Sequence, residues 1–287
     1  MGNVVEQFKY GSTQMTQGTL FTCATAEAYR DCEVHGLIIT ARCDTAHEGK
    51  TQTFNYIPIV RLSDWLKRDF IVITSARDRP QLEASLSSAL ESAAFSPTIL
   101  LTQEPRSILE RLFNGDDKKI RAAKPKFEKG VKQWEVFQSL RIPLEVPLPT
   151  VTRHFRKTHE TVIKECVNQR LAGYYFLSSV IPSEGDGEGY VALLREVHHM
   201  PTTLARKIAK GLPADDYKQL CESSGIDSSK LDFTLIDFAM PIGMIRSPEL
   251  EHLMQAFALL FTRIGISEPD LSYIENLCME HLGDKNE

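Results

Sequence analysis

The chain has 287 residues, of which 42% are hydrophobic and 25% are charged, and its formal net charge is −5. These values are ordinary for a globular protein, so general disorder is excluded, and the length allows one large domain or two modest ones. The longest strongly apolar run, Leu253 to Phe261, is too short for a membrane helix, which needs about 20 residues.

The first predicted elements are three strands. Residues 18–23 form a short strand, and the β-branched and apolar residues of 34–43 and 54–61 predict two longer ones. The polar loop 44–50 joins the last two, so we expect them to pair as a hairpin. Pro58 marks the second of these strands as an edge strand or as a strand end.

Three helices follow at apolar spacings of three and four residues. The first begins at Ser63 and Asp64, the second covers 81–94, and the third runs from Pro105 to the terminator Asn114-Gly115. Residues 115–132 are charged and poor in large apolar side chains, so they predict an exposed connection. Because 140–150 contains three prolines, we place a domain boundary within 115–150.

The second half has the same order of elements as the first. Residues 173–181 and 190–199 predict two strands around a polar turn at 183–189, and a helix runs from Pro201 to Gly211. Two explanations stay open, a structural duplication and the simple recurrence of a common α+β unit.

The C-terminal region predicts a helical hairpin. Ser247 is an N-cap, Pro248 occupies the first helical position, and apolar residues recur at helical spacing as far as Gly265. A second helix over 269–282 ends at Gly283.

Together these elements predict an α+β protein with two small, mainly antiparallel sheets, flanking helices and a C-terminal helical hairpin. We expect an N-terminal α+β domain over 1–114, a charged and Pro-rich connection over 115–150, and a C-terminal α+β domain over 151–287. The alternative is a single mixed α/β domain with one continuous sheet.

The N-terminus lacks the basic and apolar stretches of a secretory signal peptide. We therefore predict a cytoplasmic protein with no membrane association, in which the six cysteines form no disulfide framework.

A cluster of cysteines and histidines is a candidate zinc site. Cys32 and His35 form one pair of ligands, and Cys43 and His47 form another. Zinc takes four such ligands in a tetrahedron. A straight strand would hold the two pairs roughly 23 Å apart, at about 3.3 Å per residue, so the chain must bend for them to meet. The alternative is a buried Cys43 and a surface His47.

Cys43 and Asp44 are also candidate catalytic residues, because they stand where a strand meets a loop. A thiolate nucleophile at Cys43 would need a base such as His47 or His35 and an orienting carboxylate. The alternative is that Asp44 caps amide groups within the loop.

Positive charge is concentrated in the middle of the chain. Residues 105–170 carry 15 Lys and Arg against 8 Asp and Glu, a net +7 that leaves −12 for the remainder. We predict that nucleic acid, if bound, contacts Arg153, Arg156, Lys157 and the lysines of 118–132. The alternative is a solvated helix face joined to a charged linker.

One stretch resembles known sequences. The segment GLIITARCDTAHEGKTQTFNYIPIVRLSDWL (36–66) looks like the strand, Cys-Asp loop and strand at the start of some uncharacterised bacterial proteins, and SPELEHLMQAFALLFTRIGI (247–266) is similar to their C-terminal helix. The resemblance implies a bacterial source and a link with phage-defence or mobile-element loci. It transfers no catalytic residue.

No nucleotide-binding loop, HExxH, GxSxG or paired-carboxylate motif is present. We therefore predict a non-catalytic binding or adaptor component of a bacterial intracellular system, with a protein partner. The alternative is an effector enzyme that processes nucleic acid or nucleotides at the Cys43-Asp44 loop.

Overall fold

A nine-residue strand, β4 (Thr53–Arg61), joins the two halves of the chain. Along one edge it pairs with β3 (Val34–Ile38), and along the other it pairs with β6 (Tyr190–Leu193) and β7 (His198–Pro201), all antiparallel. This computed structural model describes residues 5–6, 15–47, 49–180 and 189–262. Within these residues β4 is the centre of the fold.

The main sheet is antiparallel and has the strand order β1-β10-β2-β3-β4-β6-β5. A small second sheet pairs β8 with β9. The remaining strands are β1 (Val5–Glu6), β2 (Thr19–Phe21), β5 (Tyr174–Leu177), β8 (Leu212–Pro213), β9 (Phe238–Ala239) and β10 (Pro241–Ile245).

The α+β class and the β3–β4 hairpin are confirmed, but the strands are distributed between the two sheets differently from our expectation. We expected one sheet in each half, whereas strands of both halves lie in the main sheet. The reason is that Tyr56–Val60 of β4 is buried throughout and needs a partner on both edges. The predicted return strand 190–199 is correspondingly divided into β6 and β7, which pair with different ends of β4.

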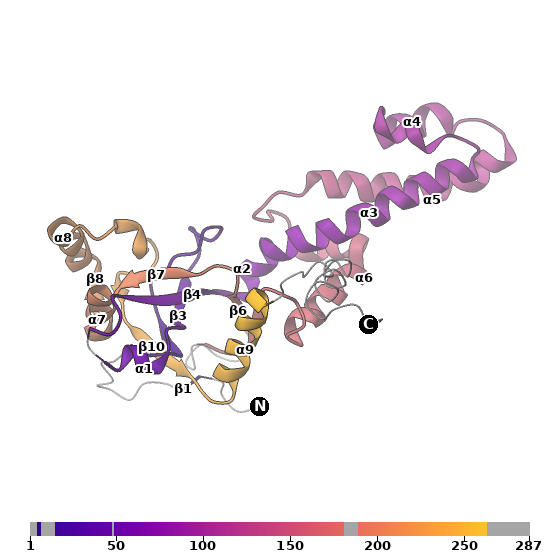
Figure 1. Ribbon diagram of the computed structural model, residues 1–287. Coiled ribbons are helices and arrows are strands. Elements are labelled where there is room, and N and C mark those ends of the chain that lie inside the picture. The colour runs from indigo at the N-terminus through magenta and orange to yellow at the C-terminus, as the bar shows by residue number, and fades with distance from the viewer. Residues whose placement is uncertain (1–4, 7–14, 48, 181–188, 263–287) are drawn as a thin grey trace, which may run out of the picture.

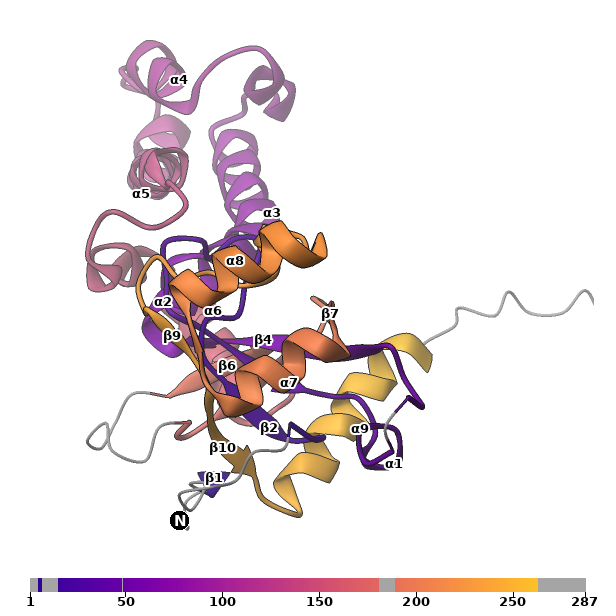
Figure 2. The ribbon, with the colours of Figure 1, turned by 90° about the vertical axis from the view of Figure 1, so that its left-hand side faces the viewer.

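Alternation along β4 divides the core between the two faces of the sheet. Tyr56 and Val60 belong to one apolar cluster, and Ile57 and Ile59 belong to another. The second cluster is closed by helix α9 (Glu249–Thr262), through Leu250 and other residues of its apolar face. The first is closed by helices that include α2 (Leu62–Lys67), α7 (Thr202–Lys210) and α8 (Ala214–Ser224), which are labelled in Figure 2.

A helical arm projects from one side of the sheet (Figure 1). It consists of α3 (Asp69–Ser92), the 3₁₀ helix η1 (Pro97–Leu101), α4 (Pro105–Leu112) and α5 (Lys118–Ser139). These elements share an apolar core of their own, separate from the two cores of the sheet. The helix predicted over 81–94 is the outer part of α3.

Helix α5 replaces the exposed connection that the composition of 115–132 predicted. Its buried residues, Ala123, Phe127, Gly130 and Val131, recur at helical spacing between lysines. Those few apolar residues are enough to bury one face of α5, because it packs along α3 and α4 as part of a shared core.

Helix α6 (Leu148–Val167) returns the chain from the arm to the sheet, and the remaining short helices are α1 (Arg42–Thr45) and η2 (Ser228–Lys230). Helix α7 ends at Gly211, as predicted, with a φ of 88° that favours glycine. The second helix of the predicted C-terminal hairpin, 269–282, lies outside the described residues.

Among the described residues, no helix combines the length and the apolar character that a membrane crossing requires.

The docking of α5 on α3 can be tested at Gly130. A Cβ atom there would lie 2.7 Å from Cδ2 of Leu86. Overpacking costs about 1–3 kcal/mol, which exceeds the helix-propensity gain of about 1 kcal/mol from Gly to Ala. We expect Gly130→Ala to lower the free energy of unfolding in urea by about 1 kcal/mol. The exposed control Lys129→Ala should be nearly neutral, and stabilisation by Gly130→Ala would contradict the packing.

A second prediction concerns His159 of α6, whose residue is 2% exposed and packs against Phe70. Burial lowers the pKa of His159 to about 4, against about 6.5 in an unfolded chain. The unfolded state therefore binds the proton first as the pH falls. Neutral, buried His159 therefore contributes fully to the free energy of unfolding above pH 6.5. As the pH falls towards 4, this contribution decreases by about 3 kcal/mol.

Urea unfolding of the wild type and of His159→Gln at pH 7 and pH 4.5 checks this. The difference in free energy of unfolding between the two proteins should be smaller at pH 4.5 than at pH 7. An unchanged difference would contradict the assigned burial of His159.

Candidate functional site

The Cys43-Asp44 loop forms α1, directly after the strand that carries His35. An ion pair closes the loop, with Nζ of Lys50 2.7 Å from Oδ1 of Asp44. The same Nζ donates to the carbonyl oxygen of Cys43 at 3.4 Å. The hydrogen bond from Lys50 lowers the pKa of Asp44. Asp44 therefore holds the loop closed through the side chain of Lys50. The alternative explanation, in which Asp44 caps amide groups of the loop, described a different contact.

Cys43 is exposed, so the alternative that it is a buried small hydrophobe is wrong. Its Sγ donates to Oδ1 of the neighbouring Asp44 at 3.6 Å. No hydrogen bond joins it to His47 or to His35 in the described part of the chain.

The four candidate zinc ligands are not brought together. His35 lies inside the sheet with no exposed surface, and its Nε2 is 3.6 Å from Oε1 of Glu33. Cys32 contacts Asp31 before the strand begins, and Cys43 follows its end. Strand β3 lies between them. Among the described residues, no group of three His, Cys, Asp or Glu residues able to hold a metal ion is found.

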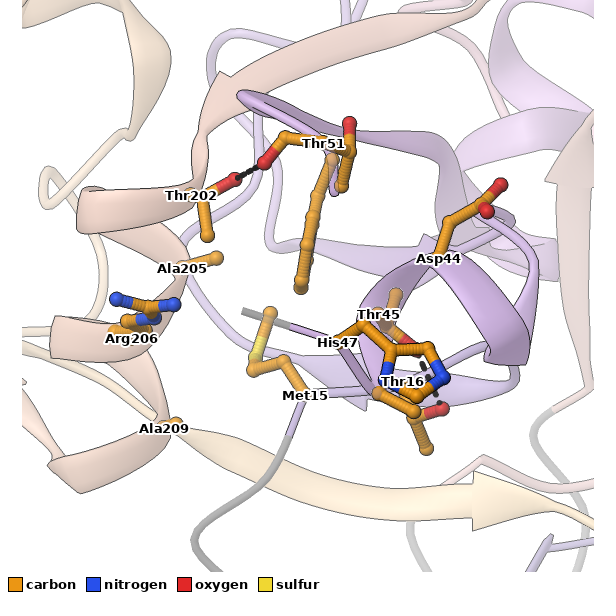
Figure 3. A pocket seen from close by; sticks show the side chains of 12 residues that line it. Met15, Thr16, Asp44, Thr45, His47, Thr51, Thr202, Ala205, Arg206 and Ala209 are labelled. Atoms are coloured by element: carbon orange, nitrogen blue, oxygen red, sulfur yellow. Dashed lines mark hydrogen bonds between the residues drawn. The ribbon is translucent and has the colours of Figure 1, made fainter. Parts of the chain in front are cut away.

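Asp44 and His47 instead line a pocket of about 320 Å³ beside α1 (Figure 3). Arg206 of α7 lies on the opposite wall, and Phe54 and Met15 provide apolar surface. Two hydrogen bonds hold the walls, from Thr202 Oγ1 to the Thr51 carbonyl oxygen at 3.0 Å and between the hydroxyls of Thr16 and Thr45 at 3.0 Å. The pocket fits a small ligand with both polar and apolar parts.

A larger pocket, about 740 Å³, is lined by residues that include 195–198 and 229–232. Its best oriented group is His198, whose Nε2 lies 2.7 Å from Oε1 of Glu196 and whose ring stacks on Tyr56 with the centroids 5.2 Å apart. His199, the next residue, contacts Lys230 instead. The sequence alone does not show that Glu196 and Tyr56 lie beside His198, because their convergence depends on the pairing of β7 with β4.

Part of the predicted positive region forms a defined surface on the arm, and Lys119, Lys124 and Lys126 lie on other sides of α5. Lys118, Arg121, Lys129 and Lys132 lie within an arc of about 80° on α5, opposite its buried residues. We call these four residues the basic face of α5. All four are exposed. In the part of the chain that the structure describes, none of the four has an ion-pair partner within 4.0 Å.

The other three candidate nucleic-acid contacts lie on α6. Arg153 donates from Nε to Nε2 of His154 at 3.1 Å, and Arg156 is paired with Glu160 at 2.6 Å. Lys157 is exposed. The structure therefore places Arg153, Arg156 and Lys157 at the base of the arm, next to the helix that carries the basic face.

Comparison with known protein families, with curated proteins and with solved structures finds no match to this chain.

Thiol labelling tests the exposure of Cys43 and the absence of a metal at the loop. Burial raises the pKa of Cys23 to about 11 and that of Cys166 to about 12, so both should remain thiols that react slowly. We expect iodoacetamide to label Cys43 in the native protein, and Cys23 and Cys166 only after denaturation, as mapped by peptide mass spectrometry. Protection of Cys43 that a chelator removes would contradict this and would indicate bound zinc.

Proposed function

We propose that this protein is a binding or adaptor component that holds nucleic acid along its helical arm. The observation that carries the proposal is the basic face of α5, a row of cations without ion-pair partners on a helix that projects from the sheet (Figure 1). The remainder of the chain outside 105–170 has a net charge of −12, so this attraction for a polyanion is local.

The shape of the basic face favours an extended ligand over a single small anion. Lys118 and Lys132 are 14 residues apart, which spans about 21 Å along a helix axis. A nucleic-acid backbone presents phosphates over such a length, and its affinity for lysine and arginine comes largely from the release of counterions. Arg153, Arg156 and Lys157 on α6 would extend the same contact towards the sheet.

The rest of the fold suits an adaptor. The sheet has an apolar core on each of its two faces, and we propose that this part of the molecule holds a protein partner while the arm holds nucleic acid. The setting we propose is the bacterial cytoplasm, within a phage-defence or mobile-element system. The support for that setting is the resemblance carried by 36–66 and 247–266.

The proposal is tested by charge reversal on the arm. The triple variant Lys118→Glu, Lys129→Glu, Lys132→Glu should bind fluorescein-labelled single-stranded RNA at least tenfold more weakly in fluorescence anisotropy. The slope of log K against log salt should also fall by about 2, because about 0.7 counterions are released per phosphate contact on a single strand.

The matched control reverses three exposed lysines on the sheet side, Lys207→Glu, Lys210→Glu and Lys218→Glu, with the same change in net charge. Its affinity should stay within about threefold of the wild type. An equal loss of RNA affinity in both variants would show that only the net charge matters. An affinity that does not change with salt concentration would also rule out the arm as the contact.

A further inference from the structure

A polar pocket of about 230 Å³ lies where three helices meet at the base of the arm. We call it the three-helix pocket. Helix α3 contributes Asp78 and the polar residues that follow it, α5 contributes Gln133, and α6 contributes the segment from His154 to Thr158. This volume is below the range that holds a drug-sized ligand, so it suits a single ring system.

Asp78 gives the pocket an unusual acceptor. Its residue is only 6% exposed, and the Thr158 hydroxyl donates to its Oδ1. Burial raises the pKa of the Asp78 carboxyl. Among the described residues Asp78 has no ion-pair partner within 4.0 Å. A carboxyl with one neutral donor retains acceptor sites, and Asp78 lines the pocket, so these sites are available to a ligand.

A break in α6 shapes the pocket wall. Phe155 has non-helical angles (φ −130°, ψ 30°) within the helix. The amide of Gln133 crosses from α5 and donates to the carbonyl oxygen of His154 at 2.8 Å. The pocket therefore combines an aromatic residue, a carboxyl acceptor and side-chain amides, which is the chemistry that proteins use to recognise unpaired nucleobases.

The charges around the pocket select against a cation. Lys157 and Arg156 line it, and Arg153 stands one turn away. Glu160 neutralises one of these three charges. A lysine or arginine of a partner would satisfy Asp78 but would meet this positive surround. A ligand that has hydrogen-bond donors at its inner end and a negative charge outside meets both demands, and a nucleotide is such a ligand.

The pocket also adjoins the basic face of α5. Gln133 follows Lys132 directly and lies one turn beyond Lys129, and residues four apart are neighbours on a helix surface. A strand whose phosphates lie on the basic face can therefore place one base at the pocket.

We propose that the three-helix pocket binds one unpaired guanine base of a single-stranded nucleic acid held on the arm, an inference that rests on the function proposed above. Guanine presents two adjacent N–H donors, N1 and N2, on its Watson–Crick edge. A carboxylate can accept from both. In adenine, cytosine and uracil an acceptor atom lies beside each donor on that edge and is repelled by the carboxylate.

The experiment uses 12-nucleotide RNAs of uridine that carry one central guanosine, adenosine, cytidine or uridine. We expect the wild type to bind the guanosine oligonucleotide at least tenfold more tightly than the other three, by fluorescence anisotropy. Asp78→Asn keeps an acceptor for Thr158 but adds donors that oppose guanine. It should abolish the preference and leave the affinity for the all-uridine RNA within about twofold.

Controls separate the pocket from the arm and from misfolding. Asp116→Asn removes an exposed carboxylate from the arm and should keep the guanosine preference. Ser85→Phe fills the pocket without changing Asp78 and should abolish the guanosine preference. Thermal melting confirms that each variant is folded. The charge-reversed arm variant should bind all four RNAs more weakly in equal proportion.

The outcomes distinguish the two proposals. A wild type that binds all four RNAs equally, with salt dependence, overturns the guanine site and leaves the arm proposal standing. A wild type that binds none of them overturns both. A guanosine preference that survives Asp78→Asn and Ser85→Phe in folded protein overturns the assignment to this pocket.

Discussion

The position of the arm depends on one buried arginine. At Arg68 the backbone leaves the helical region (φ −122°, ψ −94°), so α2 ends and α3 begins in a new direction. The Arg68 side chain is 6% exposed and is paired with Asp31 at 2.5 Å, while its Nε donates to the carbonyl oxygen of Ala28. A buried guanidinium without these partners would be severely destabilising. The loop before β3 and the arm must therefore keep their relative orientation.

The next residue adds a second link at the same place. Oδ2 of Asp69 accepts a hydrogen bond from the Tyr29 hydroxyl at 2.7 Å, and burial raises the pKa of Asp69. Farther along, Arg77 of α3 is paired with Glu165 of α6 at 2.7 Å. The arm is thus fixed to the sheet at its base and braced by α6. The basic face, which lies on α5, is held out from the sheet by contacts made in α3.

The sequence predicts those elements of the fold that depend on residues close together along the chain. The β3–β4 hairpin, the helix that begins at Pro105 and the glycine that ends α7 each depend on residues close in sequence. The sequence does not predict α5, because its apolar positions are few and form a core only together with those of α3. The division of 190–199 between β6 and β7 was missed for the same reason, as both need β4.

The sites show the same limit more sharply. The zinc hypothesis grouped Cys32 and Cys43 by distance along the chain, but a strand keeps such residues apart. The groups that do converge come from remote segments: Glu196 and His198 meet Tyr56 through strand pairing, and Asp78 meets Thr158 through helix packing. The three-helix pocket has a further dependence, because Gln133 of α5 donates to the carbonyl oxygen of His154, next to the break in α6 at Phe155. The shape of the pocket is therefore linked to the docking of the helix that carries the basic face.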